Sequence, residues 1–144
     1  AVVKVKDRKH LVRLSEKILQ QVQYQSESTS VTTSAIDAFY AGQGVCQDHA
    51  HILIAMCRAL QLPARYVSGY IYDENQPRLA SHAWAEVFVE NEWYCFDVSN
   101  QIFTPKNHIY VAVGRDYLDV APIRGIREQG GVESMMSVVQ VLAC

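Results

Sequence analysis

The chain has 144 residues, of which 49% are hydrophobic and 19% charged, which is enough for one domain with its own core and excludes a disordered composition. Its formal net charge of -2 gives no reason to expect nucleic acid or an anionic membrane as a partner. The longest apolar runs, such as residues 52–55, are far too short to span a bilayer.

The first half of the chain carries the signals of helices. Apolar residues recur at helical spacing over residues 7–23, and the polar residues 25–33 then predict a loop. A capping-box pattern predicts a short helix over residues 34–40. A third helix is predicted over residues 46–60, because an apolar stripe runs along it and Pro63 prevents much extension.

The second half has the composition and spacing of strands. Segments rich in aromatic and β-branched residues predict strands at 64–72, 82–89, 93–98, 108–113 and 135–142. A loop is predicted at 73–78 and a tight turn at 90–92. Helices followed by mostly consecutive strands predict an α+β fold with an antiparallel sheet.

The four cysteines are irregularly spaced, at positions 46, 57, 95 and 144. Their number permits two disulfides, but the chain is neither small nor rich in cysteine, which favours free thiols in a reducing, cytoplasmic setting. Residue 1 is Ala and not Met, so we expect residues 1–144 to be a single domain taken from a longer chain.

Cys46 lies in the string GQGVCQDHAH, just after two glycines and at the start of a predicted helix. The partial positive charge of a helix N-terminus favours thiolate, the attacking species, over thiol. The free backbone N–H groups there can also stabilise an oxyanion. A small buried thiol is the alternative, and the local context of Cys46 leaves both open.

His82 and Asp97 are the candidate partners of Cys46, because a cysteine nucleophile requires an imidazole and the imidazole requires a group that fixes its tautomer. His82 opens the first strand of a predicted hairpin and Asp97 lies near the end of the second. If the turn of this hairpin has an even number of residues, the residue numbers of any two facing positions add up to an odd number. The numbers of His82 and Asp97 also add up to an odd number, so the two side chains share one sheet face. We therefore expect a hydrogen bond of about 2.6–3.2 Å between them, unless a bulge intervenes.

Three segments resemble the transglutaminase-like superfamily, in particular its bacterial cysteine protease branch. They read GVCQDHAHILIAMCRALQLPARYVSGY, SHAWAEVFVENEWYCFDVSN and HIYVAVGRDYLDVAPIRG, and the resemblance runs from about Thr33 to the end. The spacings of 36 residues from Cys46 to His82 and 15 from His82 to Asp97 fit this family. Papain-like proteases place their histidine much further downstream, so they fit less well.

The resemblance implies a compact papain-like core in which the cysteine helix packs on an antiparallel sheet, with residues 1–144 as one catalytic domain. Cys46 would be the nucleophile, His82 the general base and acid, and Asp97 the group that orients the imidazole. The implied reaction is acyl transfer from an amide of a protein or peptide substrate, without a cofactor or metal. Water as acceptor gives a peptidase or amidase, which we favour from the bacterial relatives, and a lysine amine gives a transglutaminase.

The sequence departs from the family in two respects. Relatives commonly carry Pro-Thr-Asn after the aspartate, whereas Val98, Ser99 and Asn100 follow Asp97 here, which places the loop behind Asp97 in question. Bacterial relatives also often have an additional N-terminal β-rich domain, which we expect to be missing from this chain. A binding module that keeps the fold without turnover is therefore the alternative function.

Several other residues have alternative interpretations. Asp48, His49 and His51 suggest a metal site, but helix ligands are normally four residues apart. We expect Asp48 to interact with the helix N-terminus instead, and His49 and His51 to be wall or packing residues. Trp84 shares the face of His82 and either lines an acyl groove or, as we favour, packs in the interior. His108 shows no partner in the sequence and is expected to begin a strand.

Tyr40 and Gln43 lie shortly before Cys46, so either side chain could donate to an oxyanion, although backbone donors suffice. The oligomeric state has no signature in the sequence.

Overall fold

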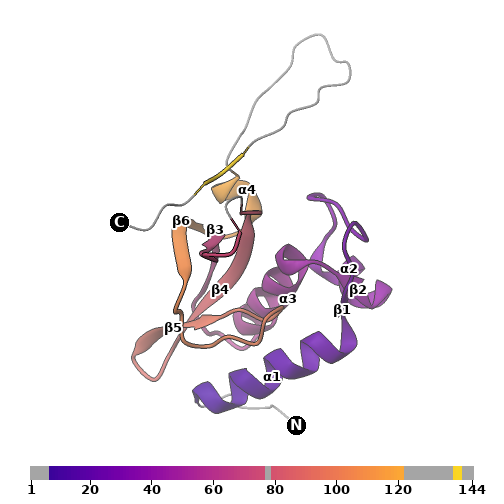
Figure 1. Ribbon diagram of the computed structural model, residues 1–144. Helices are drawn as coiled ribbons and strands as arrows, with labels where there is room; N and C mark the ends of the chain where they lie inside the picture. The colour runs from indigo at the N-terminus through magenta and orange to yellow at the C-terminus, as the bar shows by residue number, and fades with distance from the viewer. Residues whose placement is uncertain (1–6, 77–78, 122–137, 141–144) are drawn as a thin grey trace.

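The computed structural model describes residues 7–76, 79–121 and 138–140, and the statements below concern these residues. Helices form one layer and an antiparallel sheet forms the other (Figure 1). In chain order the structure contains α1 (Arg8–Gln21), β1 (Gln23–Tyr24), α2 (Ala35–Ala41), β2 (Gln43–Gly44), α3 (Cys46–Ala59), β3 (Ala64–Ile71), β4 (His82–Val89), β5 (Glu92–Phe96), β6 (His108–Gly114) and α4 (Tyr117–Val120). The predicted α+β class is confirmed.

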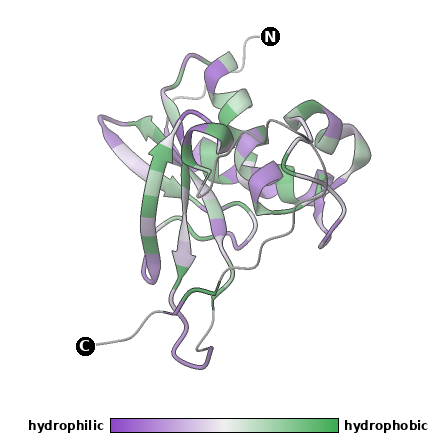
Figure 2. Ribbon diagram, turned by 90° about the horizontal axis from the view of Figure 1, so that it is seen from above, coloured by the Kyte–Doolittle hydropathy of each residue, from purple (hydrophilic) through white to green (hydrophobic). Residues whose placement is uncertain are grey.

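The main sheet has the strand order β5-β4-β3-β6, and all its neighbouring pairs are antiparallel. α3 packs against this sheet, chiefly against β4, and α1 and α2 both contact α3. Ala85 and Val87 of β4 share one buried cluster with Leu53 and Cys57 of α3. Hydrophobic residues accordingly concentrate along the strands (Figure 2). The cysteine helix therefore lies on the sheet, as the sequence predicts.

Local signals set the helix boundaries before the cysteine. Ser34 Oγ accepts a hydrogen bond from the backbone N–H of Asp37 at 3.2 Å and caps α2. Gly42, at φ 70° in the left-handed region that favours glycine, ends that helix. α3 then begins at Cys46 and ends at Ala59, close to the predicted bounds.

The β4–β5 hairpin has a turn of two residues, because Val89 pairs with Glu92. Glu90 and Asn91 both have positive φ, 54° and 63°, as the tightest hairpin turns require. The turn predicted at 90–92 is thus one residue too long, and the strand predicted at 93–98 is observed at Glu92–Phe96. Asp97 lies just beyond β5 and pairs only through an isolated bridge with Ile102.

The sequence interpretation missed a short parallel pair and placed one strand largely outside the described residues. Gln23 of β1 pairs with Gln43 of β2, which joins the end of α1 to the segment before Cys46. Of the strand predicted at 135–142, only residues 138–140 are described, and they are not a strand. The Leu79 N–H donates to the Val139 carbonyl at 3.2 Å. None of the helices in the described segments is long and apolar enough to cross a membrane.

Candidate active site

Cys46 is the first residue of α3, and its free thiol is half-buried. It lines a cavity of about 400 Å³ together with His82 of β4 and residues of β3, β6 and α4. The first N–H groups of a helix have no intrahelical acceptor, so those of α3 are available at the thiol. Asp48 is turned back toward the helix start, where its carboxylate accepts from Val45 N–H at 2.9 Å and from the Thr29 hydroxyl at 2.5 Å.

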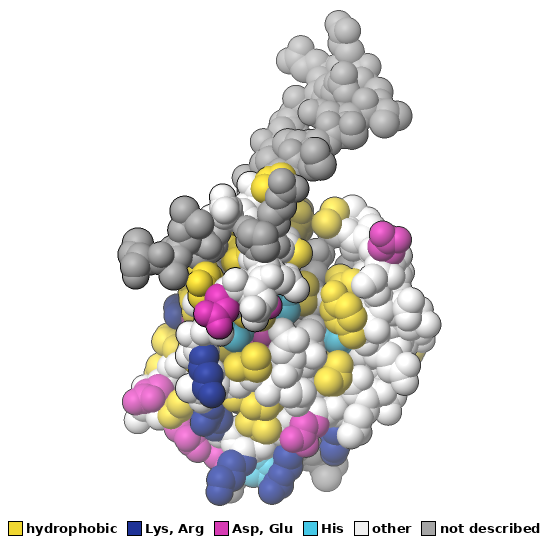
Figure 3. All heavy atoms as spheres, viewed as in Figure 1, with side chains coloured by type: hydrophobic (Ala, Val, Ile, Leu, Met, Phe, Trp, Pro, Cys, Tyr) yellow, Lys and Arg dark blue, Asp and Glu magenta, His cyan; other side chains and the backbone are white. Residues whose placement is uncertain are grey.

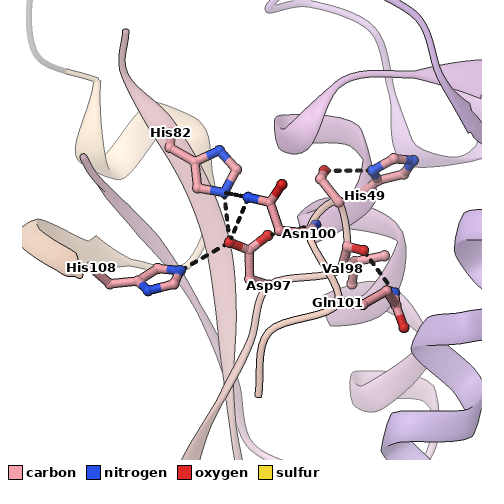
Figure 4. A network of polar contacts seen from close by, with 8 residues as sticks. His49, His82, Asp97, Val98, Asn100, Gln101 and His108 are labelled. Atoms are coloured by element: carbon pink, nitrogen blue, oxygen red, sulfur yellow. Dashed lines mark hydrogen bonds and ion pairs between the residues drawn. The ribbon is translucent and has the colours of Figure 1, made fainter. Parts of the chain in front are cut away.

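His82 and Asp97 are hydrogen bonded, as the hairpin register predicts. His82 Nε2 lies 2.8 Å from Asp97 Oδ2, and the two side chains point toward one another (Figure 4). Asn100 Nδ2 approaches both groups, at 3.3 Å from His82 Nε2 and 3.2 Å from Asp97 Oδ2. Because Nε2 faces the carboxylate, Nδ1 is the nitrogen of His82 left for the thiol.

Asp97 is fully buried, at 0% exposure, and its carboxylate is held by several donors. Oδ2 accepts from His82, from His108 and from the Asn100 amide, while Oδ1 accepts from the Asn100 backbone N–H at 3.2 Å. Burial opposes the negative charge, but the hydrogen bonds from His82, His108 and Asn100 outweigh it and lower the pKa of Asp97. Asp97 is therefore ionised at neutral pH.

The ionisation of His82 follows from its neighbours. Burial disfavours the imidazolium, but hydrogen bonds to Asp97 and Cys46 and the negative charges of both groups raise the pKa of His82 to about 9. The His82 ring thus lies between the carboxylate of Asp97 and the thiol of Cys46, where it can pass a proton to or from a substrate. The structure thus brings the three predicted site residues together, and their catalytic roles stay predictions.

His108 has a partner that the sequence interpretation did not find. It begins β6, as predicted, and its Nε2 lies 2.9 Å from Asp97 Oδ2. Trp84 is fully buried, with its ring 4.7 Å from that of His108 and 5.8 Å from that of His82. The interpretation of Trp84 as a packed aromatic, rather than the wall of a groove, is confirmed.

His49 fixes the loop behind Asp97. The ring is fully buried, with Nδ1 2.7 Å from Ser99 Oγ and Nε2 2.7 Å from the Val22 carbonyl. Ser99 therefore anchors the loop to α3, while Asn100 holds Asp97. The departure from Pro-Thr-Asn leaves the aspartate supported from both sides.

His49, His51 and Asp48 do not converge on a metal site, because each side chain has a different partner. His51 Nε2 accepts from the Tyr117 N–H at 3.2 Å. Within the described segments, the group that could hold a metal ion is His82, Asp97 and His108, whose ligating atoms lie within 4.8 Å of one another. Their hydrogen bonds already account for that closeness.

Neither Tyr40 nor Gln43 lines the cavity of Cys46, and the Tyr40 side chain is 81% exposed. The face of the molecule seen in Figure 3 has histidine side chains near its centre, among hydrophobic and uncharged ones, with Lys and Arg gathered along its lower rim.

Fold and site together define a class of protein: a helix that begins with a cysteine packs on an antiparallel sheet, and one hairpin of that sheet presents a hydrogen-bonded histidine and aspartate. The sequence profile of the transglutaminase-like superfamily matches residues 3–98, which include all three predicted site residues. The chain belongs to the transglutaminase-like superfamily.

Relatives in sequence come from mycobacteria. An uncharacterized protein of Mycobacterium leprae is 34% identical over 140 residues, which cover 93% of this chain and 50% of that protein. An uncharacterized protein of Mycobacterium tuberculosis is 37% identical over 137 residues, covering 87% of this chain and 44% of that protein. The chain therefore spans about half the length of these relatives.

Solved structures of similar fold include three proteins. A candidate cysteine protease from Cytophaga hutchinsonii has a TM-score of 0.69 and 38% identity, covering 77% of this chain and 37% of that one. LapG of Legionella pneumophila has a TM-score of 0.60 and 18% identity, covering 76% of this chain and 66% of that one. A protein described as a TGase has a TM-score of 0.56 and 16% identity, covering 70% of this chain and 28% of that one. The last two show the fold alone.

Proposed function

We propose that this protein transfers acyl groups from amide bonds of a protein or peptide substrate through a thioester on Cys46, with water as the usual acceptor. The observation that supports this most strongly is the shared cavity. Cys46 and His82 line it together, and the other side of the His82 ring is bonded to the buried carboxylate of Asp97.

The first half of the reaction forms the thioester. The Cys46 thiolate attacks the amide carbonyl carbon, and N–H groups at the start of α3 donate hydrogen bonds to the oxygen, on which negative charge develops. His82 then gives its proton to the departing amine as the C–N bond breaks. Asp97 keeps the ring in the orientation that allows this transfer.

The second half releases the acyl group. Water attacks the thioester, His82 takes a proton from it, and the C–S bond breaks to return the thiolate. An amine in place of water would give a transglutaminase with the same residues. Hydrolysis is favoured because the solved relative at 38% identity is described as a candidate cysteine protease, whereas the TGase at 16% is alike in fold alone.

An activated ester tests the thioester directly. p-Nitrophenyl acetate should acetylate Cys46 in a burst of p-nitrophenolate, and mass mapping should find the acetyl group there. Cys46→Ala and His82→Ala should lose the burst, while Cys95→Ala should keep it, because Cys95 is buried at 3% exposure away from the cavity. A burst that survives in Cys46→Ala would refute the proposal.

Incubation of the protein with casein and a fluorescent primary amine then shows whether water or an amine accepts the acyl group. Release of peptides that depends on Cys46 supports hydrolysis, and incorporation of the amine without peptide release would make the protein a transglutaminase. Absence of both the ester burst and casein turnover would favour the non-catalytic binding module.

A further inference from the structure

We propose that His108 is a positioning residue of this site, which holds the carboxylate of Asp97 in the orientation that His82 requires. The inference rests on the proposed function, because it assigns His108 a part in the same reaction. It starts from one geometric fact: Nε2 atoms of two histidines share a single oxygen, Oδ2 of Asp97, at 2.8 Å and 2.9 Å.

The two histidines differ in their access to the cavity. His82 lines the cavity with Cys46, whereas His108 does not. Side-chain exposure is 14% for His82 and 1% for His108. His82 is therefore the ring that can reach a substrate, and His108 acts on the reaction only through Asp97.

His108 acts as a donor to Asp97. A buried carboxylate is stable only if donors surround it, so the ring must present N–H on Nε2 to Oδ2. Nδ1 of His108 is buried and has no hydrogen-bond partner among the described residues. The neutral tautomer with its proton on Nε2 fits these surroundings, because it leaves no buried N–H unpaired.

The place of His108 is fixed by packing that does not involve Cys46. Its ring packs against that of Trp84 in a T-shaped arrangement, with the ring centroids 4.7 Å apart and the planes at 82°. β6 holds its backbone through the pairing of His108 with Ile71. Figure 4 shows His82 and His108 approaching the same oxygen from two directions. Rotation of the carboxylate would break both bonds, so His108 restrains Asp97 in the rotamer that serves His82.

Two amide substitutions test the role of the Nε2 donor. The side-chain amide of Gln reaches about as far as Nε2 of His, whereas that of Asn reaches only the position of Nδ1. His108→Gln should therefore retain the hydrogen bond to Asp97. His108→Asn should lose this bond, although it introduces a side chain of similar polarity. The readout is the rate of Cys46 acetylation by p-nitrophenyl acetate near pH 7, with thermal unfolding measured alongside.

We expect His108→Asn to slow acetylation by about tenfold, the usual effect of losing one hydrogen bond to a charged group, and His108→Gln to recover most of the rate. Tyr110→Phe is the matched control, because Tyr110 packs on Trp84 at 5.2 Å but bonds to Glu86 and not to Asp97. Its rate should equal that of the parent.

The His82→Ala variant distinguishes a failure of the proposed acyl-transfer function from a failure of the positioning role of His108. If His82→Ala loses the burst but the Gln and Asn variants of His108 have equal rates, the proposed function stands and the positioning role is wrong. Equal loss in both variants, accompanied by equal loss of thermal stability, would also overturn it. If His82→Ala has no effect, the proposed function fails, and the positioning role fails with it.

Discussion

The three cysteines of the described segments differ in reactivity because of where each thiol lies. Burial raises the pKa of Cys57 to about 12, and burial with the nearby charges of Asp97 and Glu86 does the same for Cys95. Cys46 is half-buried at the start of α3 beside His82. Among these three thiols, reactivity in the native protein should therefore be confined to Cys46.

Brief treatment with iodoacetamide at neutral pH should alkylate Cys46 at least ten times faster than Cys57 or Cys95, because only the thiolate attacks. Mass mapping of peptides gives the three rates. In strong denaturant the difference should disappear, which serves as the control. Equal labelling of the three thiols in the folded protein would contradict the assignment.

Asp97 sets much of the proton affinity of His82, so Asp97→Asn should lower the pKa of His82 from about 9 toward its ordinary value of about 6.5. At pH 8 the parent ring should be mostly protonated and the variant ring mostly neutral. NMR titration of the His82 ring measures this. Asp73→Asn in the exposed β3–β4 loop is the control, and an unchanged titration in Asp97→Asn would show that the carboxylate has no such effect.

Gly69 lets β6 approach β3 where the sheet carries the site. It pairs with His82 on one side and with Tyr110 on the other, next to a register shift in the β3–β6 ladder. A Cβ at this position would collide with the Ile109 carbonyl and lie 2.8 Å from the tip of Trp84. Glycine is thus required at position 69 because of strand packing and not because of a turn.

Gly69→Ala should lower the free energy of unfolding by about 1–3 kcal/mol, because a backbone carbonyl cannot rotate away as a side chain can. Urea denaturation measures the change, and Ser68→Ala at the preceding position is the control. If both variants were equally stable, the close approach of β6 to β3 would be disproved.

Strands and helices could largely be predicted because their signals are local. The apolar stripe of α3, the cap at Ser34 and the aromatic and β-branched residues of β4 each depend on residues within a few positions of one another. The β1–β2 pair was missed because two residues per strand carry no periodicity. The start of β5 was misplaced because Glu90 and Asn91 lack the glycine that usually marks so tight a turn.

Two histidines of α3 link this helix to other parts of the domain, and His49 is fully buried whereas His51 is half-buried. Burial lowers the pKa of His49 and of His51, and both rings lie on α3. His49 joins α1 to the loop of Ser99, and His51 accepts from the N–H that begins α4. Protonation of His51 would break the bond that it accepts from the Tyr117 N–H, and protonation of His49 would place a positive charge on a fully buried ring.

The free energy of unfolding should therefore fall as the pH is lowered from about 6.5 to 5, because the unfolded chain binds protons on these histidines more readily than the folded one. His82, whose pKa is raised to about 9, offsets part of this change near pH 6.5, where the unfolded chain is still taking up its proton, and none of it near pH 5. Urea denaturation at several pH values tests this. His49→Gln should reduce the slope, and stability that rises toward pH 5 would contradict the prediction.

The class of fold, the helix that begins at Cys46, and the shared face of His82 and Asp97 could be predicted from the amino-acid sequence alone. Each of these follows from periodicity, capping or the parity of a single hairpin, which act over short stretches of chain. A resemblance in three segments added the family, which the profile match to residues 3–98 confirms.

The groups that surround the buried carboxylate of Asp97 could not be predicted, because long-range packing brings them there. β5 and β6 are the two edge strands of the sheet, but its antiparallel pairing places the end of β5 and the start of β6 at the same end. There His108 reaches Asp97, which lies just beyond β5. The bond from His49 to Ser99 likewise spans 50 positions of the chain. Such contacts have no local signature, because a buried charge can be satisfied by any donor that the fold happens to bring within about 3 Å.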